Sequence, residues 1–281
     1  MFYNFVILEV MIFNQYKIPL RLEKHIANLI YHKDYFPEHK KDKYLPDGTI
    51  NIVFELTNNP KFIYDNETGK IAQKCTDVWF SGVLKDYITI SSHHEEMIVL
   101  VFKPGAGFPL IHSSVSKYTN QVVPAEQIFG KHILLLLKEL KLPTSVQEKF
   151  LAIEQWLNEQ LKADDFYLEV IRYAINNIES SPTHINLNEL SKKMGYSQKQ
   201  FIQLFKKYVG LTPKQFHRII RFNEILSVVE NKERISWTTI ANDCGYFDQA
   251  HFIKDFQSFS GINPKKYLCD IEDFPNFLPI K

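Results

Sequence analysis

The feature that most constrains this chain is a motif of about 22 residues that occurs twice. The first copy is GYSQKQFIQLFKKYVGLTPKQF, residues 195–216, and the second is GYFDQAHFIKDFQSFSGINPKKY, residues 245–267. In both copies two phenylalanines are followed by a glycine, a proline and an aromatic residue, at separations of 4, 5, 3 and 3 residues. The second copy has one extra residue after its Gly-Tyr pair. One structural unit is therefore encoded twice.

Each copy predicts a pair of helices joined by a tight turn. A separation of four residues places two phenylalanines on the same helical face. The glycine ends that helix, and Thr212-Pro213 or Asn263-Pro264 provides the N-cap and first residue of the next one. A short apolar helical pattern also precedes each Gly-Tyr pair. Each unit therefore reads as helix, turn, helix, the motif of many DNA-binding proteins.

Residues 165–268 resemble the DNA-binding domain of the AraC/XylS family of transcription regulators. The resemblance rests on both copies, and above all on the run IANDCGYFDQAHFIKDFQSFSGINPKKY. It implies two helix-turn-helix units joined by a long helix, here Pro213 to Glu230, with one recognition helix from each unit in successive major-groove segments. It also implies double-stranded DNA and RNA polymerase as partners. A sequence-specific DNA-binding regulator is expected, and not an enzyme.

The recognition helices supply the candidate DNA contacts. In each helix the phenylalanine pair faces the core, so Gln and Lys side chains on the opposite face can bind base edges or phosphates. The resemblance places base contacts at Lys199, Gln200 and Gln203, and the matching face of the second helix selects Gln249, His251 and Lys254. Phosphate contacts are predicted for Lys206, Lys207, Arg218 and Arg221. Asp248 is predicted to be an N-cap, because a carboxylate repels phosphate.

Charge is distributed unevenly between the two units. The chain carries a net charge of only +1, but residues 185–222 hold eight basic residues against one acidic residue, a net +7. Residues 223–268 hold five basic and six acidic residues, a net −1. The first unit therefore has the electrostatic character expected for binding a polyanion. The net charge of −1 on the second unit is also compatible with an alternative function, a protein-interaction adaptor whose helix-turn-helix fold no longer binds DNA.

The N-terminal half predicts a β-rich domain. Pro46-Asp47-Gly48 signals a turn, and strand-forming runs follow at residues 50–56, 61–64, 78–80, 87–90 and 97–102. Short strands at this density, over about residues 44–112, favour a small antiparallel barrel or sandwich. Before them, Leu22, Ile26, Leu29 and Ile30 predict one short amphipathic helix.

Helical periodicity takes over at about residues 125–162. Apolar residues from Ile128 to Leu140 predict a helix interrupted near Gly130, and Ser145 with Glu148 predicts a capping box. An apolar seam then runs along Val146 to Leu161. This helix can pack on its own N-terminal domain, or pair with the same helix of a second subunit to make a homodimer. Asp164 is predicted to cap the first helix of the DNA-binding domain.

The predicted architecture is thus α+β with two domains. Residues 1–163 form a sensing or dimerising domain, residues 164–270 the double helix-turn-helix domain, and residues 271–281 a C-terminal tail. The segments YLPDGTINIVFEL, WFSGVLKDYITI and LVFKPGAGFPL resemble a cupin-like N-terminal domain found on some AraC-type regulators. That resemblance implies the architecture more than the chemistry, and it leaves a small-molecule effector as one expected partner. Trp79, Phe80 and Phe102 are candidate lining residues of its pocket, with core packing as the alternative.

The alternative function is a cupin-like enzyme or ligand-binding protein that carries a DNA-targeting domain. His93 to Glu96 contains metal-ligand residue types, but neighbours on a strand point to opposite faces, so a solvated turn is expected, with no metal and no cofactor. The three cysteines are widely spaced and predict neither a disulfide framework nor a zinc site, and Cys244 is expected in the core. No stretch approaches the ~20 apolar residues of a membrane span, so a cytoplasmic protein is expected.

Overall fold

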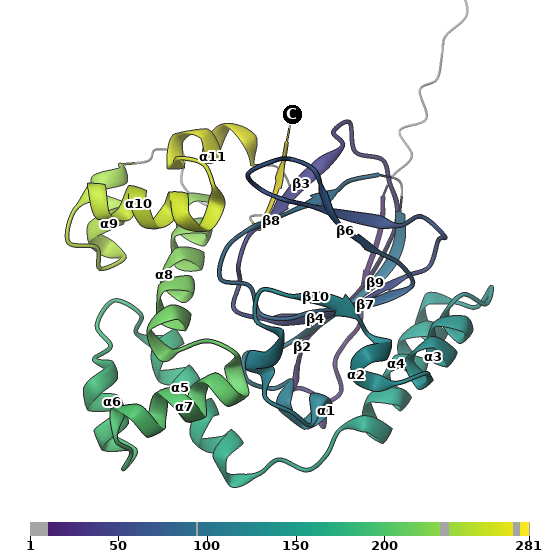
Figure 1. Cartoon of the computed structure of the whole chain (residues 1–281), viewed down its shortest axis with the longest axis horizontal. Coiled ribbons are helices and arrows are strands. Elements are labelled where there is room, and N and C mark those ends of the chain that lie inside the picture. The colour runs from purple at the N-terminus through teal and green to yellow at the C-terminus, as the bar shows by residue number, and fades with distance from the viewer. Residues whose placement is uncertain (1–10, 94, 231–235, 272–275, 281) are drawn as a thin grey trace, which may run out of the picture.

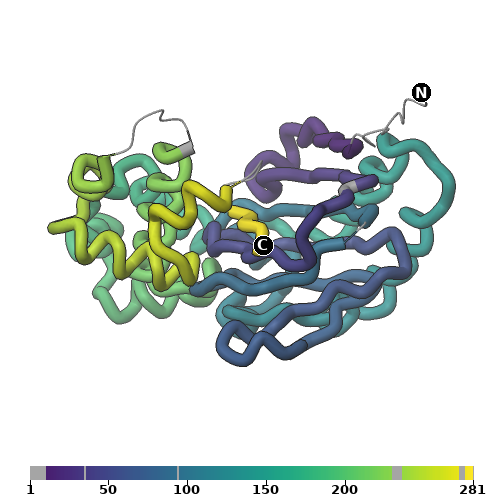
Figure 2. Tube along the Cα trace, turned by 90° about the horizontal axis from the view of Figure 1, so that it is seen from above, coloured from purple at the N-terminus to yellow at the C-terminus, as the bar shows by residue number. Residues whose placement is uncertain are grey.

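The computed structural model describes residues 11–93, 95–230, 236–271 and 276–280 (Figure 1). It consists of an antiparallel β domain, a helical connection and a C-terminal helical domain, so the predicted α+β architecture with two domains is confirmed. Figure 2 shows the helical domain beside the β domain, with the last strand of the chain returning to the β domain. No helix in the described ranges is long and apolar enough to cross a membrane.

Two antiparallel sheets make up the β domain. In the described residues, the six-stranded sheet has the order β1 (Ile12–Gln15), β2 (Ile26–Tyr35), β9 (Glu95–Phe102), β4 (Ile50–Glu55), β7 (Val78–Ser81) and β10 (Val122–Pro124). The five-stranded sheet has the order β11 (Phe277–Pro279), β3 (Lys41–Tyr44), β8 (Ile88–Ser91), β5 (Lys61–Tyr64) and β6 (Ile71–Cys75). The five strand runs predicted from the sequence are all present.

The six-stranded sheet is apolar on both faces. Successive side chains of a strand point to opposite faces, so Ile52 and Phe54 of β4 pack into the main core while Val53 packs toward the second sheet. On β7, Phe80 takes the first face and Trp79 the second. One face of the sheet is therefore covered by helices, and the other faces the interior between the two sheets.

The helix predicted around Leu22 to Ile30 is wrong. This segment is a turn followed by β2, which pairs with β1 on one side and β9 on the other, with a bulge between Ile26 and Asn28. Leu29 is buried in the main core, and Ile30 lines the space between the sheets. Both faces of the strand meet apolar surroundings, so its residues lack the alternation that marks a half-buried strand.

The helical connection covers the outer face of the six-stranded sheet (Figure 1). It comprises α1 (Phe108–Ile111), the 3-10 turn η1 (Val115–Tyr118), α2 (Glu126–Phe129), α3 (His132–Leu140) and α4 (Val146–Gln160). The Ser145–Glu148 capping box is confirmed. Phe150, Ile153 and Leu157 of the apolar seam are each at most 3% exposed within the same chain. The seam packs on its own domain, so it offers no surface for pairing with a second subunit.

The C-terminal domain contains the two predicted units and a helix before them. Its helices are α5 (Phe166–Ser180), α6 (Leu187–Lys193), α7 (Gln198–Val209), α8 (Pro213–Glu230), α9 (Trp237–Asp243), α10 (Gln249–Ser260) and α11 (Pro264–Asp270). The N-cap of α5 is Asp165 and not Asp164. Asp164 instead forms ion pairs with Arg172 (2.7 Å) and Lys24 (2.5 Å), which join the two domains.

The predicted C-terminal tail is part of the β domain. Phe277–Pro279 forms β11, which pairs with β3 at the edge of the five-stranded sheet, and Leu278 is 1% exposed. The chain therefore leaves the β domain, forms both helix-turn-helix units and returns to the domain in which it began.

Candidate nucleic-acid interface and the cavity behind it

The first unit is formed by α6, a turn and α7. Ser197 caps α7, and the Gln200 side chain returns the bond to the Ser197 backbone, which completes a capping box. Phe201 and Phe205 are at most 2% exposed and meet edge to face at 5.7 Å between ring centroids. Gly210 ends the helix with a φ of +88°. The spacing of the phenylalanines thus fixes which face of α7 is buried.

The opposite face of α7 is exposed and carries most of the predicted contacts. Lys199, Gln203 and Lys206 are all exposed. Gln200 is exposed too, but its Oε1 is committed to the capping box, 3.1 Å from the Ser197 backbone nitrogen. Lys207 differs, because its ammonium lies 4.8 Å from the ring centroid of Phe108 in α1. Lys207 is therefore directed at α1 of the helical connection in this structure.

The second unit repeats this arrangement on α9 and α10. Asp248 is the N-cap of α10, as predicted, and accepts from the His251 backbone nitrogen (2.7 Å). Phe252 and Phe256 are buried, while Gln249, His251 and Lys254 are exposed. The side-chain oxygen of Gln249 accepts from Thr238 Oγ1 at 3.3 Å.

The extra residue of the second copy is Phe247, which the sequence reasoning did not single out. It follows the Gly-Tyr pair, displaces the N-cap by one position and is 93% exposed in the turn before α10. An exposed aromatic residue beside a recognition helix can make apolar contact with a thymine methyl group. The signal was the one-residue difference between the two copies.

Arg218 and Arg221, both predicted to bind phosphate, contact the second unit. The Arg218 guanidinium donates to both oxygens of Asp255 on α10 (2.8 and 3.3 Å), and this bonding holds its pKa above the usual range. Arg221 stacks on Tyr246 with 3.8 Å between the guanidinium carbon and the ring centroid. Both side chains therefore attach α8 to the second unit, and a phosphate would have to share them with these partners.

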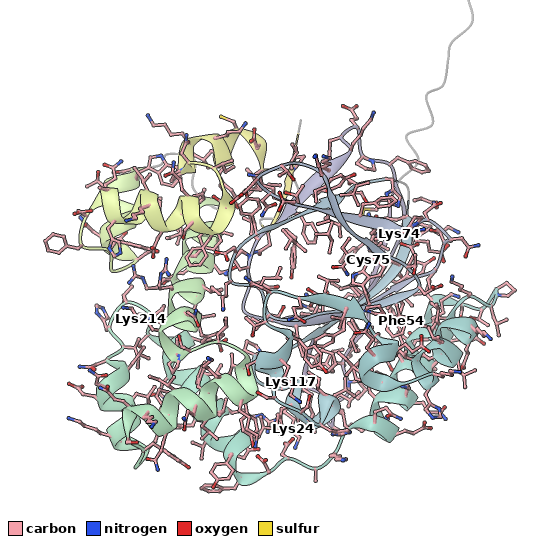
Figure 3. The ribbon with its side chains drawn as sticks, in the orientation of Figure 1. Lys24, Phe54, Lys74, Cys75, Lys117 and Lys214 are labelled. Carbon is pink, nitrogen blue, oxygen red and sulfur yellow. The ribbon has the colours of Figure 1, made fainter. Side chains whose placement is uncertain are left out.

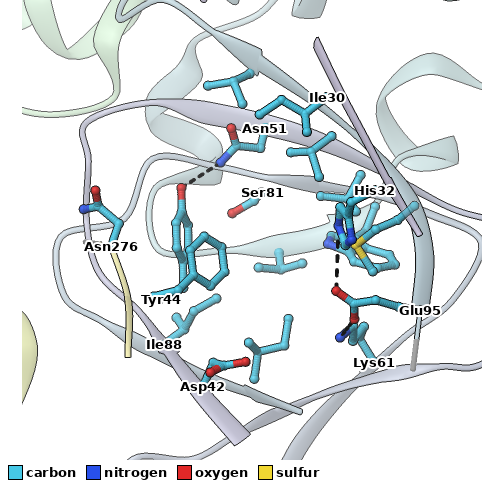
Figure 4. A pocket seen from close by; sticks show the side chains of 18 of the residues that line it. Ile30, His32, Asp42, Tyr44, Asn51, Lys61, Ser81, Ile88, Glu95 and Asn276 are labelled. Carbon is cyan, nitrogen blue, oxygen red and sulfur yellow. Dashed lines mark hydrogen bonds and ion pairs between the residues drawn. The ribbon is translucent and has the colours of Figure 1, made fainter. Parts of the chain in front are cut away.

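A cavity of about 380 Å³ lies between the two sheets (Figure 4). Its wall is mostly aliphatic and aromatic, and includes Ile30, Val53, Trp79, Ile88 and Phe277. Of the three lining residues predicted from the sequence, the structure brings only Trp79 to the cavity. Phe80 and Phe102 are fully buried in the main core, because they point to the opposite face of the sheet.

One end of the cavity holds a buried ion pair. Lys61 pairs with Glu95, and His32 Nε2 lies 3.7 Å from Glu95 Oε1. Burial, reinforced by the positive charge of Lys61, lowers the pKa of His32 to about 4, so the imidazole is neutral. The solvated turn predicted for residues 93–96 is wrong at Glu95, which begins β9 and is 7% exposed. The described residues contain no group of three His, Cys, Asp or Glu side chains arranged to hold a metal.

The other end of the cavity carries a chain of hydrogen bonds. Asn51 Nδ2 donates to the Tyr44 hydroxyl (3.0 Å), which donates to Asp47 (2.7 Å). Burial first, and then the Asp47 carboxylate, hold the pKa of Tyr44 well above its usual value, so the phenol keeps its proton and its role as donor. Tyr44 also packs on Phe277 at 4.9 Å between ring centroids.

The same end of the cavity touches α8. Asp47 belongs to the turn at residues 46–48, and Asn223 Nδ2 of α8 donates to the Pro46 carbonyl (2.9 Å). A Cβ on Gly48 would lie 3.0 Å from the Phe216 ring, so this turn is packed closely against the helix. Asn276, which lines the cavity, donates to Asn223 Oδ1 (2.9 Å).

The β domain also touches both helix-turn-helix units at their glycine turns. Thr119 Oγ1 donates to the Gly210 carbonyl (2.7 Å), and Lys43 Nζ donates to the Ser260 carbonyl (3.2 Å). A Cβ on Gly261 would lie 2.5 Å from the Tyr87 ring. Figure 3 shows Lys117 of η1 at this junction and Lys214 at the outer side of the helical domain. The β domain thus holds both units as well as the helix between them.

Comparison with known proteins gives matches over both halves of the chain. Residues 190–269 match the family described as a helix-turn-helix domain, and residues 15–124 match a domain of unknown function, DUF6597. The Msm operon regulatory protein of Streptococcus mutans is 27% identical over 142 residues, 50% of this chain and 49% of that protein. The transcriptional regulator GbdR of Pseudomonas aeruginosa is 30% identical over 84 residues, 29% of this chain and 22% of that protein.

Solved structures of similar arrangement include ToxT from Vibrio cholerae, with a TM-score of 0.46, 10% identity and coverage of 88% of this chain and 98% of that chain. The chain spans about half the length, or less, of the curated relatives it matches. The Msm operon protein and GbdR are regulators, and the helix-turn-helix match at residues 190–269 contains both copies of the repeated motif. The C-terminal domain is therefore a helix-turn-helix domain of the AraC type, and the chain is similar to transcription regulators that carry such a domain.

Proposed function

We propose that this protein is a sequence-specific DNA-binding regulator of transcription, acting in the cytoplasm. The observation that carries the proposal is the pair of exposed faces on α7 and α10, mounted at the two ends of α8 (Figure 1). Both helices bury a phenylalanine pair and present Gln and Lys to solvent. Two such helices on one rigid support can enter successive major-groove segments.

The side chains divide into two roles. Lys199, Gln200, Gln203, Gln249, His251 and Lys254 read base edges, and Lys206, Lys207, Arg218 and Arg221 hold phosphates. Of the base-reading residues, Lys199, Gln203 and Lys254 are exposed and are not bonded to another side chain in the described part of the chain. Lys207, Arg218 and Arg221 bind phosphate only after exchanging or sharing their present partners.

We further propose that a small-molecule effector binds the cavity between the sheets and modulates the helical domain. The support is the position of the cavity: one end of it is built from Tyr44, Asn51 and Asn276, next to the contacts with α8. A volume of about 380 Å³ lies within the range of small-molecule sites. A regulator of this family also has RNA polymerase as its expected partner.

The test is selection of genomic DNA fragments by the full chain, followed by gel shifts of a selected fragment and of random duplex over a salt series. A regulator should prefer the selected fragment by at least about 10³-fold, with an affinity that falls steeply as salt rises. An adaptor that no longer binds DNA would retain neither the preference nor the salt dependence. Selected fragments would also show which genes adjoin the binding site.

A further inference from the structure

The charges around the cavity restrict the effector that it can accept. In the part of the chain that the structure describes, Lys61 is the one lysine or arginine that lines the cavity, whereas Asp42, Asp47 and Glu95 all line it. His32 is neutral, as its lowered pKa requires. The lining is therefore net acidic, and an anionic ligand would meet a negative potential inside an apolar wall.

Lys61 is not available to offset that potential. Its ammonium is paired with Glu95 and also donates to the Ser91 carbonyl (3.1 Å). Both partners of the ion pair are buried, with Lys61 5% and Glu95 7% exposed. A carboxylate entering the cavity would have to displace Glu95 from the lysine, and a displaced Glu95 would be left as a buried, unpaired charge.

The carboxylates are committed as well. Asp42 accepts from His39 at 2.7 Å, and Asp47 accepts from Tyr44 and from Thr49. A cationic ligand would therefore lose its hydration on entering the cavity, and every carboxylate that it could meet there already has another partner. What remains for a ligand is the apolar wall and uncharged hydrogen-bonding groups.

The C-terminal strand supplies part of this wall. Phe277 of β11 lines the cavity, and its ring packs on that of Tyr44 in a tilted arrangement. Asn276 lines the same end of the cavity as Tyr44 (Figure 4). These two residues follow the DNA-binding domain in the chain, and the amide of Asn276 binds Asn223 on α8. A ligand that packs against Phe277 thus touches a segment joined directly to the helix that carries both units.

We propose that the cavity is a receptor for an uncharged, mostly apolar molecule, which packs against Phe277 of the C-terminal strand. This inference rests on the proposed effector role of the cavity and specifies its ligand class. The cost of burying an unpaired charge excludes carboxylates and ammonium ions, and the aromatic pair formed by Tyr44 and Phe277 receives apolar surface.

The test uses 1-decanol, decanoate and decylamine, which share one chain and differ in charge. Calorimetry with the full chain, without DNA, should give at least a tenfold higher affinity for 1-decanol than for either ion. Phe277→Ala should weaken 1-decanol binding at least fivefold, whereas Phe166→Ala, which removes a ring 72% exposed on α5, should leave it unchanged.

Glu95→Gln is the sharper variant, because it frees the Lys61 ammonium. Decanoate should then bind at least tenfold more tightly than it binds the natural chain, with 1-decanol little changed. Glu96→Gln is the matched control: Glu96 is the next residue on β9, but it binds Tyr31 and Lys33 outside this cavity. Circular dichroism checks that each variant folds.

If Glu95→Gln does not fold, the double variant Lys61→Met with Glu95→Gln removes both charges, and it should still prefer 1-decanol. Decanoate binding the natural chain as tightly as 1-decanol would overturn the inference while leaving the effector role intact. No binding of any of the three probes would overturn the effector role itself. DNA binding is tested separately by the gel shifts.

Discussion

The two helix-turn-helix units share one sequence pattern but differ in how they are held and charged. Both place a phenylalanine pair in the core and end the recognition helix at a glycine with positive φ, +88° at Gly210 and +68° at Gly261. The first unit caps its recognition helix with Ser197 in a capping box, and the second uses Asp248 alone. The shared pattern thus fixes the shape of the unit, and the remaining residues set its surface.

Two acidic residues of the second unit have structural roles. Asp248 caps α10, and Asp255, 7% exposed on the same helix, binds Arg218 of α8. Two of the six acidic residues in 223–268 are therefore engaged in holding the helical domain together. The first unit has its basic residues Lys199 and Lys206 exposed on the recognition helix. The comparison separates a unit with an exposed, basic recognition helix from a unit whose recognition helix is paired with Arg218 of α8.

The largest expected effect tests whether the two cores are equivalent. Phe205 and Phe256 occupy matching positions and are at most 1% exposed, so each change to alanine should lower the free energy of unfolding by about 3–5 kcal/mol. Denaturant unfolding followed by circular dichroism measures this. Ile202→Ala, on the exposed face of α7, is the control and should cost far less. A cost at one position several times that at the other would mean that the units are not equivalent.

The next effect separates the DNA-reading roles of the units. Gln203→Ala should weaken binding to the selected DNA fragment by about 1–3 kcal/mol and leave binding to random duplex nearly unchanged. Gln249→Ala should do the same at base pairs about one helical turn away. Gel shifts on fragments with single base-pair changes map both effects. Equal losses on specific and random DNA would remove the glutamine from the base-reading set.

A smaller effect tests the charge asymmetry. The double change Lys206→Gln and Lys207→Gln should flatten the slope of log K against log salt by about 2, since each of these proposed phosphate contacts contributes about 0.9. The matched double change Lys265→Gln and Lys266→Gln, on α11 of the second unit, should alter the slope much less. Similar slope losses from both pairs would show that the second unit contributes equally to phosphate attraction.

The smallest effect concerns pH and the attachment of α8 to the first unit. His217 of α8 binds the Pro182 carbonyl, and its pKa is lowered by burial, an effect that the carbonyl opposes and Arg221 reinforces. A lowered pKa in the folded state means that the unfolded chain takes up the proton first. The neutral His217 side chain therefore contributes its full stabilisation of the folded state above pH ~6.5, and this stabilisation is lost as pH falls through that value.

Urea unfolding at pH 7.5 and 5.5 measures that loss. His217→Gln should reduce the difference in stability between the two pH values, whereas His251→Gln, an exposed change in the second unit, should keep it. If the pH dependence of stability is unchanged in His217→Gln, the acid sensitivity belongs to other groups. His25 and His32 are candidates, because their pKa values are also lowered.

The sequence by itself determined the parts of this protein that depend on neighbours along the chain. The spacing of Phe201 and Phe205, the turn at Gly210 and the N-cap at Asp248 are local relations, and each is found as predicted. The runs at residues 50–56 and 97–102 were recognisable as strands because their β-forming residues are contiguous. The Ser145–Glu148 capping box is local in the same way.

Only the tertiary structure decided relations between residues far apart. Residues 26–35 form a strand because β1 and β9 supply its hydrogen bonds, and the tail becomes β11 because β3 offers an open edge. Lys61 meets Glu95, and Arg218 meets Asp255, across separations that no local pattern records. Whether Trp79 or Phe80 faces the cavity depends on the register of β7 against β4. The sequence of β7 alone does not determine that register.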